Sequence, residues 1–381
     1  MILLIAYGER ALPQGVFDLR SFLRSHGHKA EVVHLYGDIG SLQAVTHEPT
    51  HIGISVYTQV SGQLRPLIAA VRAKWPKAKV ILGGWHITAD TLEVETDLPE
   101  LVDHLVIGEG EYALADILDG RPDRIVYGGL LSAEDYAALP LPTREEIEEF
   151  FRAYPERVRF ARGCPNSCTF CTANRKRVIR IDPEKAARYA ADVRQWVGGT
   201  VYVLDDIFTT DRDWLNAYAD ASDTPIRCFV HGRDFDTALA ETLSRANVVH
   251  ATLGAESGDD GVLKLIAKRA TVDDYWLVHR VLKYFPSIQL HCLWMLGLPG
   301  ETEATLAKTL DLAGRIGNRQ PNFGFALPYP GSVFWKYRER WGKIIQPDWS
   351  KWETCRPAFI PHGLTEEYLM RMRTKAREIR I

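Results

Sequence analysis

The segment ARGCPNSCTFC, residues 161–171, decides how the rest of this chain is interpreted. It places Cys164, Cys168 and Cys171 within eight residues, with three residues between the first two cysteines and two between the last two. Thiolates are the ligands that iron–sulfur clusters prefer, and three of them satisfy three irons of a four-iron cubane. The fourth iron then keeps an open position, at which a small molecule can chelate it through nitrogen and oxygen.

A zinc site or a chance cluster is the alternative explanation of this trio. Structural zinc takes four ligands, and no histidine or cysteine nearby in the sequence completes the set. Two of the other cysteines, Cys228 and Cys292, lie in strand patterns and are expected to be small buried hydrophobic residues. Cys355 remains a candidate for a ligand or a radical quencher near the active site.

Composition and charge exclude several classes of protein. The 381 residues suffice for two or three domains, and the net charge of −3 gives no basic face for nucleic-acid binding. No apolar stretch approaches the length that a membrane span requires, and no secretion signal is recognised. Clustered cysteines in such a chain favour a metal centre in the reducing cytoplasm.

The first 130 residues alternate apolar strand patterns with amphipathic helix patterns. We expect strands near residues 2–6, 30–35, 52–56, 80–82 and 105–107, and helices near 16–26 and 64–75. This alternation predicts an α/β domain with a parallel, doubly wound (Rossmann-like) sheet. Such a sheet binds ligands beyond the carboxyl ends of its strands.

A linker is expected over residues 131–155, in which Pro140 and Pro142 precede a short charged helix, and a second βα series follows over residues 156–335. We expect its strands near residues 157–161, 200–205, 226–230, 249–254, 289–296 and 322–327, with helices near 183–196, 236–245, 272–284 and 302–316. Six βα units predict a partial (βα)6 barrel. Residues 336–381 form a short carboxyl-terminal segment that ends in a basic helix, near 365–379.

The cysteine spacing, with Phe170 just before the last cysteine, resembles that of the radical S-adenosylmethionine (SAM) superfamily. The resemblance implies that Cys164, Cys168 and Cys171 hold a [4Fe–4S] cluster. It also implies that SAM binds the open iron and is cleaved to a 5′-deoxyadenosyl radical, with electrons from an external donor such as flavodoxin or ferredoxin.

Further segments resemble the family in the same order along the chain. The strand that ends in LDDIF has two carboxylates where the family commonly has a GGE form, and they lie beside the methionyl group of SAM or cap the next helix. The resemblance makes candidates for SAM binding of Asp205, Asp206, Arg233, Glu256, Gly297 and Pro299. Glu256 belongs to a Gly-x-Glu-Ser segment, and Gly297 and Pro299 to a loop on the adenine side.

The first domain resembles the cobalamin-binding domain at the start of many radical SAM enzymes, on its GGWHIT (83–88) and GEGE (108–111) segments. The implied cobalamin-binding residues are Tyr57, Thr58, Gln59, Gly83, Gly84, His86, Thr88, Gly108 and Glu109. An Asp-x-His-x-x-Gly motif is absent from the sequence, so histidine is not expected to ligate the lower face of the cobalt. The alternative is a related domain that has lost its cofactor or binds another ligand.

The function expected from this resemblance is methylation of an unactivated carbon of a small metabolite or peptide, through the 5′-deoxyadenosyl radical and methylcobalamin. A cyclase, ring-contraction or rearrangement enzyme with the same domains is the first alternative. A cluster- or cobalamin-binding carrier or sensor without catalysis is the second. Methylthio transfer is disfavoured, because no second cysteine trio lies near the amino terminus. The sequence does not identify the substrate.

Overall fold

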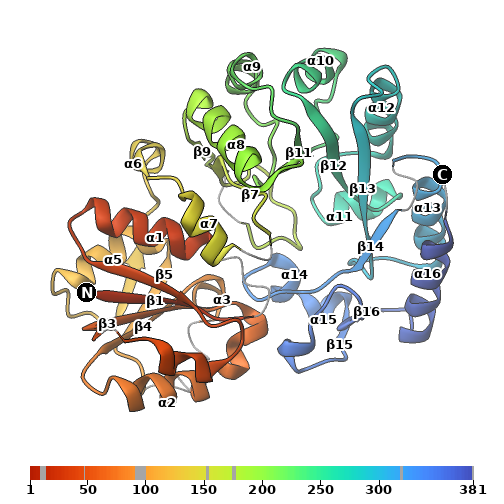
Figure 1. Ribbon diagram of the computed structural model, residues 1–381. Coiled ribbons are helices and arrows are strands. Elements are labelled where there is room, and N and C mark those ends of the chain that lie inside the picture. The colour runs from red at the N-terminus through yellow and green to blue at the C-terminus, as the bar shows by residue number, and fades with distance from the viewer. Residues whose placement is uncertain are drawn as a thin grey trace. The chain divides into compact units, whose positions relative to one another are not determined.

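The computed structural model of the chain describes residues 1–8, 14–46, 48–90, 100–151, 154–173, 177–317 and 321–379. The chain divides into two compact units (Figure 1). Unit 1 comprises Met1–Tyr154 with the short segment Asp348–Lys351, and unit 2 comprises Pro155–Pro347 with Trp352–Ile381. Within the described ranges, no helix has the length and apolarity needed to cross a lipid bilayer.

Unit 1 is built on a sheet of six parallel strands in the order β2-β1-β3-β4-β5-β6. The strands are β1 (Ile2–Ala6), β2 (Ala30–His34), β3 (His51–Ser55), β4 (Lys79–Gly83), β5 (His104–Gly108) and β6 (Ile125–Gly128). The strand order reverses at β1, which lies between β2 and β3. Doubly wound sheets bind ligands outside the carboxyl ends of their strands at such a point. The predicted Rossmann-like domain is confirmed.

Helices cover this sheet and connect its strands. They are α1 (Gln14–Ser25), α2 (Leu64–Lys74), α3 (Trp85–Ala89), α5 (Gly110–Leu118), α6 (Ala133–Ala138) and α7 (Arg144–Phe150), with the 3-10 helices η1 (Ile39–Ala44), η2 (Thr58–Gln63) and η3 (Trp349–Lys351). Buried residues recur every three or four positions along α2, as expected of a helix that covers a sheet: Leu64, Leu67, Ile68 and Val71. This stripe shares a hydrophobic core with Leu3 and Ile5 of β1.

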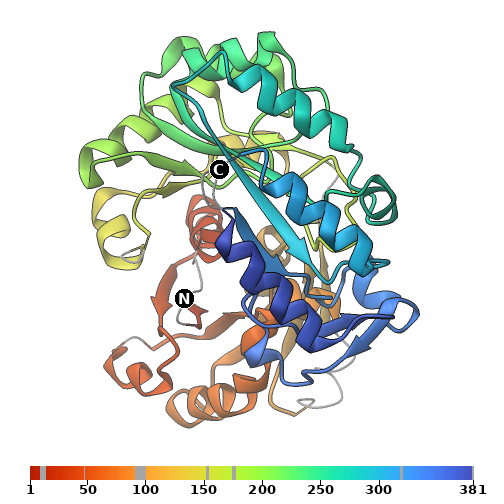
Figure 2. The same cartoon turned by 90° about the vertical axis from the view of Figure 1, so that its right-hand side faces the viewer.

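Unit 2 is a curled half-barrel of six parallel strands in the order β14-β13-β12-β11-β10-β7 (Figures 1 and 2). The strands are β7 (Arg157–Val158), β10 (Val201–Val203), β11 (Ile226–Val230), β12 (Val248–Glu256), β13 (Gln289–Leu296) and β14 (Asn322–Phe325). Two small antiparallel pairs accompany them: β8 (Ala161–Arg162) with β9 (Ile179–Arg180), and β15 (Gly342–Ile344) with β16 (Phe359–Pro361). The predicted partial (βα)6 barrel is confirmed.

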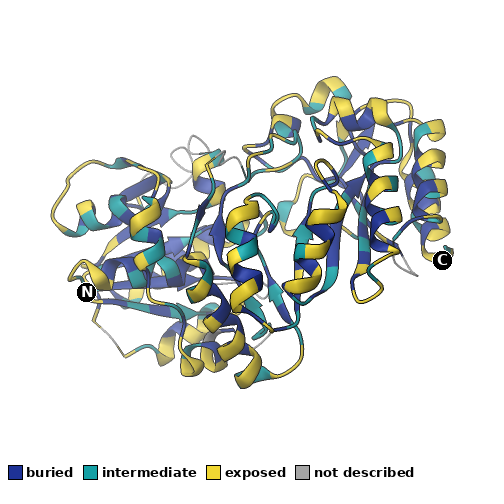
Figure 3. Cartoon of the chain, turned by 90° about the horizontal axis from the view of Figure 1, so that it is seen from above, coloured by how far each residue is buried: buried dark blue, intermediate teal, exposed yellow. Residues whose placement is uncertain are grey.

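The helices that connect the strands of unit 2 lie along the outer side of the curved sheet (Figure 1), whereas the helices after the last strand do not all lie there. They are α8 (Pro183–Val197), α9 (Arg212–Ala221), α10 (Thr237–Arg245), α11 (Asp260–Leu265), α12 (Val272–Leu282) and α13 (Glu303–Ala313), followed by α14 (Val333–Lys336), α15 (Arg338–Trp341) and α16 (Glu366–Glu378). Most of them present exposed residues to solvent and buried residues to the core of the unit, whereas α15 has no buried residue (Figure 3). Along β11, Ile226, Cys228 and Val230 are buried, whereas Arg227 is exposed. One face of the strand is therefore packed, and the other is open.

Two of the strands that are shorter than the sequence patterns predict lie next to the cysteine loop. The strand expected at 157–161 breaks after Val158, and the strand expected at 200–205 ends at Val203. The cause is one carboxylate, because Oδ1 of Asp205 accepts hydrogen bonds from the backbone nitrogens of Phe160 (2.8 Å) and Ala161 (2.9 Å). These bonds replace a strand ladder and direct the chain into the cysteine loop.

Candidate functional site

The cysteine loop leaves β8 at the carboxyl-terminal end of the half-barrel strands. Gly163 turns the chain with a φ of 98°, a conformation that favours glycine. Farther along, the backbone nitrogen of Thr169 donates to the carbonyl of Ile266 (2.9 Å), and that of Cys171 donates to the carbonyl of Cys168 (3.1 Å). The loop is thus held both by its own turn and by the segment that follows α11.

The three thiols of this loop lie within one another's electrostatic field. Burial raises the pKa of each, to about 11 for Cys171, and the Cys164 and Cys168 sulfurs raise the pKa of Cys171 further. The backbone nitrogen of Ala173 donates to Sγ of Cys171 (3.3 Å) and stabilises its thiolate. Free thiols in this loop are protonated at neutral pH, so a bound metal centre has to displace their protons.

The number and type of donors in this loop favour a cubane over a single zinc ion. In the described ranges, no three histidine, cysteine, aspartate or glutamate side chains converge on the position of one ion. Structural zinc takes four ligands on one centre, and the loop offers three thiols. A cubane instead places each thiolate on a different iron, so the sulfurs stay apart. The three thiols therefore match the donor set of a cluster in which the trio leaves one iron unligated.

A buried ion pair lies beside the cysteines at the end of β12. Nζ of Lys268 donates to Oε1 of Glu256 over 2.9 Å, and both side chains are about nine-tenths buried. Burial alone would lower the pKa of Lys268, but Glu256 and the Cys168 sulfur outweigh it, and the pKa is raised. A Cβ on Gly254 would lie 2.5 Å from Oε1 of Glu256. Glycine at position 254 therefore makes room for the pair.

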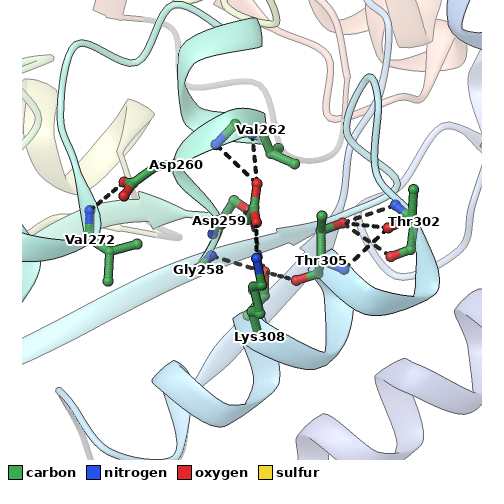
Figure 4. A network of polar contacts seen from close by, with 11 residues as sticks. Gly258, Asp259, Asp260, Val262, Val272, Thr302, Thr305 and Lys308 are labelled. Atoms are coloured by element: carbon green, nitrogen blue, oxygen red, sulfur yellow. Dashed lines mark hydrogen bonds and ion pairs between the residues drawn. The ribbon is translucent and has the colours of Figure 1, made fainter.

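Glu256 was expected from the sequence, and the structure places it at the cysteine end of the barrel with a φ of 63°. Its direct partner is Lys268, which the sequence analysis missed, because a lysine in the run AKRAT gives no signal that it is buried. The loop after Glu256 is fixed separately (Figure 4). Asp259 accepts from the backbone of Gly261 and Val262 and from Nζ of Lys308 (2.7 Å).

The two carboxylates after β10 differ in environment. Asp205 is buried; its Oδ1 bonds the backbone before the cysteine loop, and its Oδ2 lies 3.5 Å from Nη1 of Arg180. Burial raises the pKa of Asp205 to about 6. Asp206 is exposed and close enough to Cys164 and Cys171 to raise the pKa of both. Neither carboxylate caps the next helix, because α9 is capped by Asp211.

Arg233 and the glycine–proline loop complete the predicted SAM residues. Arg233 follows β11, has a half-exposed side chain and lies 3.6 Å from Oδ2 of Asp234. Gly297 adopts a φ of 85° directly after β13, and Pro299 is buried. Oε2 of Glu301 accepts from the backbone nitrogens of Gly297 (2.7 Å) and Leu298 (3.0 Å) and closes this loop. Burial raises the pKa of Glu301 to about 8.

The predicted cobalamin residues of unit 1 lie at the carboxyl ends of β3, β4 and β5. Tyr57 precedes η2, which contains Thr58 (buried) and Gln59 (half-buried). His86 is buried at the start of α3, and burial lowers its pKa. Its ring meets the indole of Trp349 edge to face, with centroids 4.9 Å apart. Trp349 was missed, because its position far along the chain gives no sign that it belongs to unit 1.

The glycines expected to approach a ligand have packing reasons within the fold. Gly84 has a φ of 100°, and a Cβ there would lie 2.8 Å from the backbone nitrogen and oxygen of Val56. Gly83, which precedes it, ends β4. Gly108, at the end of β5, donates its backbone N–H to Oγ1 of Thr88 (3.0 Å). These glycines let the loops after β3, β4 and β5 approach one another at one edge of the sheet.

Glu109 has a structural role in the same edge. The side chain is buried, and Oε2 accepts from the backbone nitrogen of Leu131 over 2.7 Å. This bond fastens the start of α5 to the segment after β6. A contact between Glu109 and cobalamin stays a prediction from the family resemblance.

Cysteines and histidines outside the motif also have defined places. Cys228 and Cys292 are fully buried, as expected of small hydrophobic residues, and Cys355 donates to Oε2 of Glu353 (3.0 Å). The ring of His231 bonds the carbonyl of Lys268 (3.0 Å) and so ties β11 to the buried ion pair. His291 lines a cavity, as described below.

Two family models match parts of the chain, one in each unit. Residues 158–313 match the family model described as the Radical SAM superfamily, and residues 2–118 match that of the B12 binding domain. The first match contains all three cysteines of the loop, and Glu256 and Gly297 as well. The second covers the strands of unit 1 from β1 to β5 and all nine residues predicted to bind cobalamin.

Curated relatives are distant but extend over most of the chain. An uncharacterized methyltransferase of Pyrococcus horikoshii is 22% identical across 97% of this chain and 87% of its own length. The anaerobic magnesium-protoporphyrin IX monomethyl ester cyclase of Rubrivivax gelatinosus is 24% identical across 85% of this chain and 64% of its own.

Solved structures share the fold. The radical SAM methyltransferase TsrM of Kitasatospora setae, with cobalamin and a [4Fe–4S] cluster bound, superposes with a TM-score of 0.68. It is 15% identical, and the match covers 91% of this chain and 76% of TsrM. The cobalamin-dependent radical SAM enzyme OxsB, also 15% identical, gives 0.66 over 84% of this chain and 53% of OxsB.

Proposed function

Because the chain belongs to the radical SAM superfamily and carries a B12-binding domain ahead of its radical SAM domain, we propose that it is a cobalamin-dependent methyltransferase. Its substrate is a small metabolite or peptide, and the methyl group goes to an unactivated carbon. We divide the chain accordingly into a cobalamin domain (1–130), a linker (131–155), the radical SAM barrel (156–335) and a carboxyl-terminal segment (336–381).

The observation that carries this proposal is the cysteine trio at the carboxyl end of a half-barrel, in a chain whose first domain matches the B12 binding domain. When bound, the cluster supplies the electron that cleaves SAM, and cobalamin supplies the methyl group. The protein's own residues hold and orient these groups. Cys164, Cys168 and Cys171 ligate three irons, while Asp206 and Arg233 present polar groups to SAM.

Several residues act on the site indirectly. Asp205 holds the backbone that leads into the cysteine loop. Glu301 shapes the loop that approaches the adenine side. The Lys268 ammonium, next to Cys168, offsets part of the negative charge that three thiolates bring to the loop. An external flavodoxin or ferredoxin delivers the electron, and the cytoplasm is the proposed location, since a thiolate-ligated cluster needs cysteines that are kept reduced.

A second candidate function is a cyclisation or rearrangement with the same domains, as the resemblance to the Rubrivivax cyclase suggests. The two reactions differ in what happens to SAM. A methyltransferase has to recharge its cobalamin with a methyl group from SAM, and it releases S-adenosylhomocysteine. A cyclase cleaves SAM only to 5′-deoxyadenosine and methionine.

The test uses anaerobically reconstituted protein with bound cluster and cobalamin, reduced and mixed with SAM that carries a deuterated methyl group. We expect one cobalamin per chain and S-adenosylhomocysteine in at least equal amount, with the deuterated methyl group retained on the protein-bound cobalamin. A protein that forms 5′-deoxyadenosine but no S-adenosylhomocysteine is a cyclase or rearrangement enzyme. A protein that forms neither product, with both cofactors intact, is a carrier or sensor.

A further inference from the structure

A cavity of about 580 Å³ lies in unit 2, on the open face of the half-barrel and away from the cysteine loop. Its wall comes from the amino-terminal halves of the strands and from α16. Tyr202, Arg227 and His250 are register partners on β10, β11 and β12, and Thr252 and His291 are partners on β12 and β13. Partners in a parallel ladder point to the same side of a sheet, so these side chains share one surface.

The lining is strongly basic. Arg227, Arg373 and Arg377 contribute three guanidinium groups, and none of the described residues around the cavity is aspartate or glutamate. Arg227 lies over the ring of Tyr202 (5.7 Å), and Arg373 over that of Phe325 (5.4 Å). Within the described part of the chain, neither of these two arginines forms an ion pair with a carboxylate, so their fork-shaped donors are available to an anion.

Two histidines complete the wall, and each ring nitrogen can donate or accept a hydrogen bond, depending on the tautomer. Nδ1 of His250 lies 2.9 Å from Nε2 of His291, so one ring donates to the other. Burial lowers the pKa of both, and Arg227 lowers both further. The pair is therefore neutral at pH 7, and the arginines supply the positive charge of the cavity.

The cavity and the cluster loop lie at opposite ends of the same strands. His250 is six residues before Glu256 on β12, and His291 is six residues before Gly297. At about 3.3 Å per residue, this separation is about 20 Å along the barrel. By strand alternation Leu293 and Met295 lie on the same face between the two ends, so the intervening surface is apolar.

We propose that this cavity anchors the substrate through an anionic group, a carboxylate or a phosphate ester, while the reacting carbon lies at the far end of an elongated, apolar portion. The inference rests on the proposed function, because it takes the radical SAM centre as the place of reaction. The proposal restricts the substrate to organic acids or phosphate esters in which an elongated, apolar portion separates the negative group from the methylated carbon.

The test measures binding without turnover, by isothermal titration calorimetry on the reconstituted holoenzyme. The probes are 4-phenylbutyrate, phenyl phosphate and the neutral 4-phenylbutanamide. We expect the anions to bind and the amide not to, with at least tenfold weaker anion binding in Arg227→Gln/Arg373→Gln, since charge-assisted hydrogen bonds are lost. Arg227→Lys keeps the charge and retains most of the affinity. Arg280 is an exposed residue of α12, so Arg280→Gln is the matched control and leaves the affinity for the anions unchanged.

Tighter binding of phenyl phosphate assigns a phosphate ester, and tighter binding of 4-phenylbutyrate assigns a carboxylate. The inference is overturned if no anion binds, if the amide binds as tightly as the carboxylate, or if the double variant binds anions like the wild type. Thermal melting of each variant verifies that it is folded. Release of S-adenosylhomocysteine, measured on the same preparations, tests the proposed function independently, because the arginines lie far from the cluster loop.

Discussion

Several charged side chains near the cysteine loop are buried, so their charges are not stabilised by water and depend on a partner in the protein. The Lys268–Glu256 pair is the clearest case, because both groups are buried and each compensates the other. Breaking such a pair by removing one charge leaves the partner uncompensated, which costs about 3 to 5 kcal/mol. An exposed pair such as Glu184 with Arg188 on α8 contributes well under about 1 kcal/mol.

Glu256→Gln should therefore lower the free energy of unfolding of unit 2 by about 3 kcal/mol, measured by urea denaturation of the protein without cofactors. Glu184→Gln on the exposed pair is the control and should change it by less than about 0.5 kcal/mol. Equal effects of the two substitutions would show that the buried pair does not stabilise the fold.

Glu301 makes the free energy of unfolding depend on pH. Its pKa is raised to about 8 in the folded protein by burial, against about 4.5 when unfolded. The folded state thus binds the proton more tightly, so this contribution to stability is complete below pH 4.5 and is lost as the pH rises through 8. It amounts to about 5 kcal/mol over that window.

Glu301→Gln should remove this slope, because an amide accepts the same backbone hydrogen bonds without ionising. The measurement compares urea midpoints of wild type and variant between pH 5 and pH 9. We expect the urea midpoint of the variant to rise relative to that of the wild type as the pH increases. Parallel pH profiles for the two proteins would contradict the account.

At the scale of elements, helix caps fix the loops that present these residues. Oδ1 of Asp259 caps α11, and its Oδ2 pairs with Lys308 of α13, which holds the loop after Glu256 (Figure 4). Lys308 is the mostly exposed partner, while Asp259 is mostly buried. The helix cap should therefore contribute more to the free energy of unfolding than the ion pair does.

Asp259→Ala should lower the unfolding free energy by about 1 to 2 kcal/mol, because it leaves backbone N–H groups of α11 without an acceptor. Lys308→Ala should lower it by less than about 1 kcal/mol. Thermal denaturation of both variants in parallel gives the comparison. A larger loss in the lysine variant would assign the stability to the ion pair instead.

The sequence predicted the elements that carry strong apolar periodicity. The bounds expected for the strands at 226–230 and 289–296 agree with β11 and β13, since both strands are apolar on their packed face. Helix α9 was missed, because its apolar positions are diluted by aspartates and an asparagine. The β15–β16 pair was missed as well, because strands of three residues are too short to show periodicity.

The candidate site was predictable where it depends on local motifs and not where it depends on tertiary contacts. The cysteine trio and Glu256 follow from short segments. Lys268, Glu301 and Trp349 acquire their roles only through burial or through partners distant in sequence. The arginine-lined cavity likewise draws its residues from separate strands and from α16, so no contiguous pattern indicates it.

At the scale of the whole molecule, the chain crosses between its two units three times, because Asp348–Lys351 returns to unit 1. This short segment places η3 beside η2 and the Trp349 indole against His86, at the edge of the sheet where cobalamin is proposed to bind. The carboxyl-terminal part of the chain therefore contributes to the environment of the first domain.

Trp349→Ala should expose the His86 imidazole to water and let its lowered pKa rise toward 6.5, since burial is the main cause of the shift. Nuclear magnetic resonance titration of histidine-labelled protein measures this directly. Trp276→Ala, on α12 of unit 2, is the control. An unchanged His86 titration would mean that Trp349 does not cover the ring.

The most direct test of the account's central claim, that the trio leaves one iron open for SAM, is electron–nuclear double resonance on the reduced protein. The experiment adds SAM labelled with ¹⁵N in its amino group and ¹⁷O in its carboxylate. The account predicts about four irons per chain and hyperfine coupling of both labels to the cluster. Serine at any of Cys164, Cys168 and Cys171 should abolish the signal, whereas Cys355→Ser should keep it. Zinc in place of iron, or a cluster without coupling to either label, would contradict it.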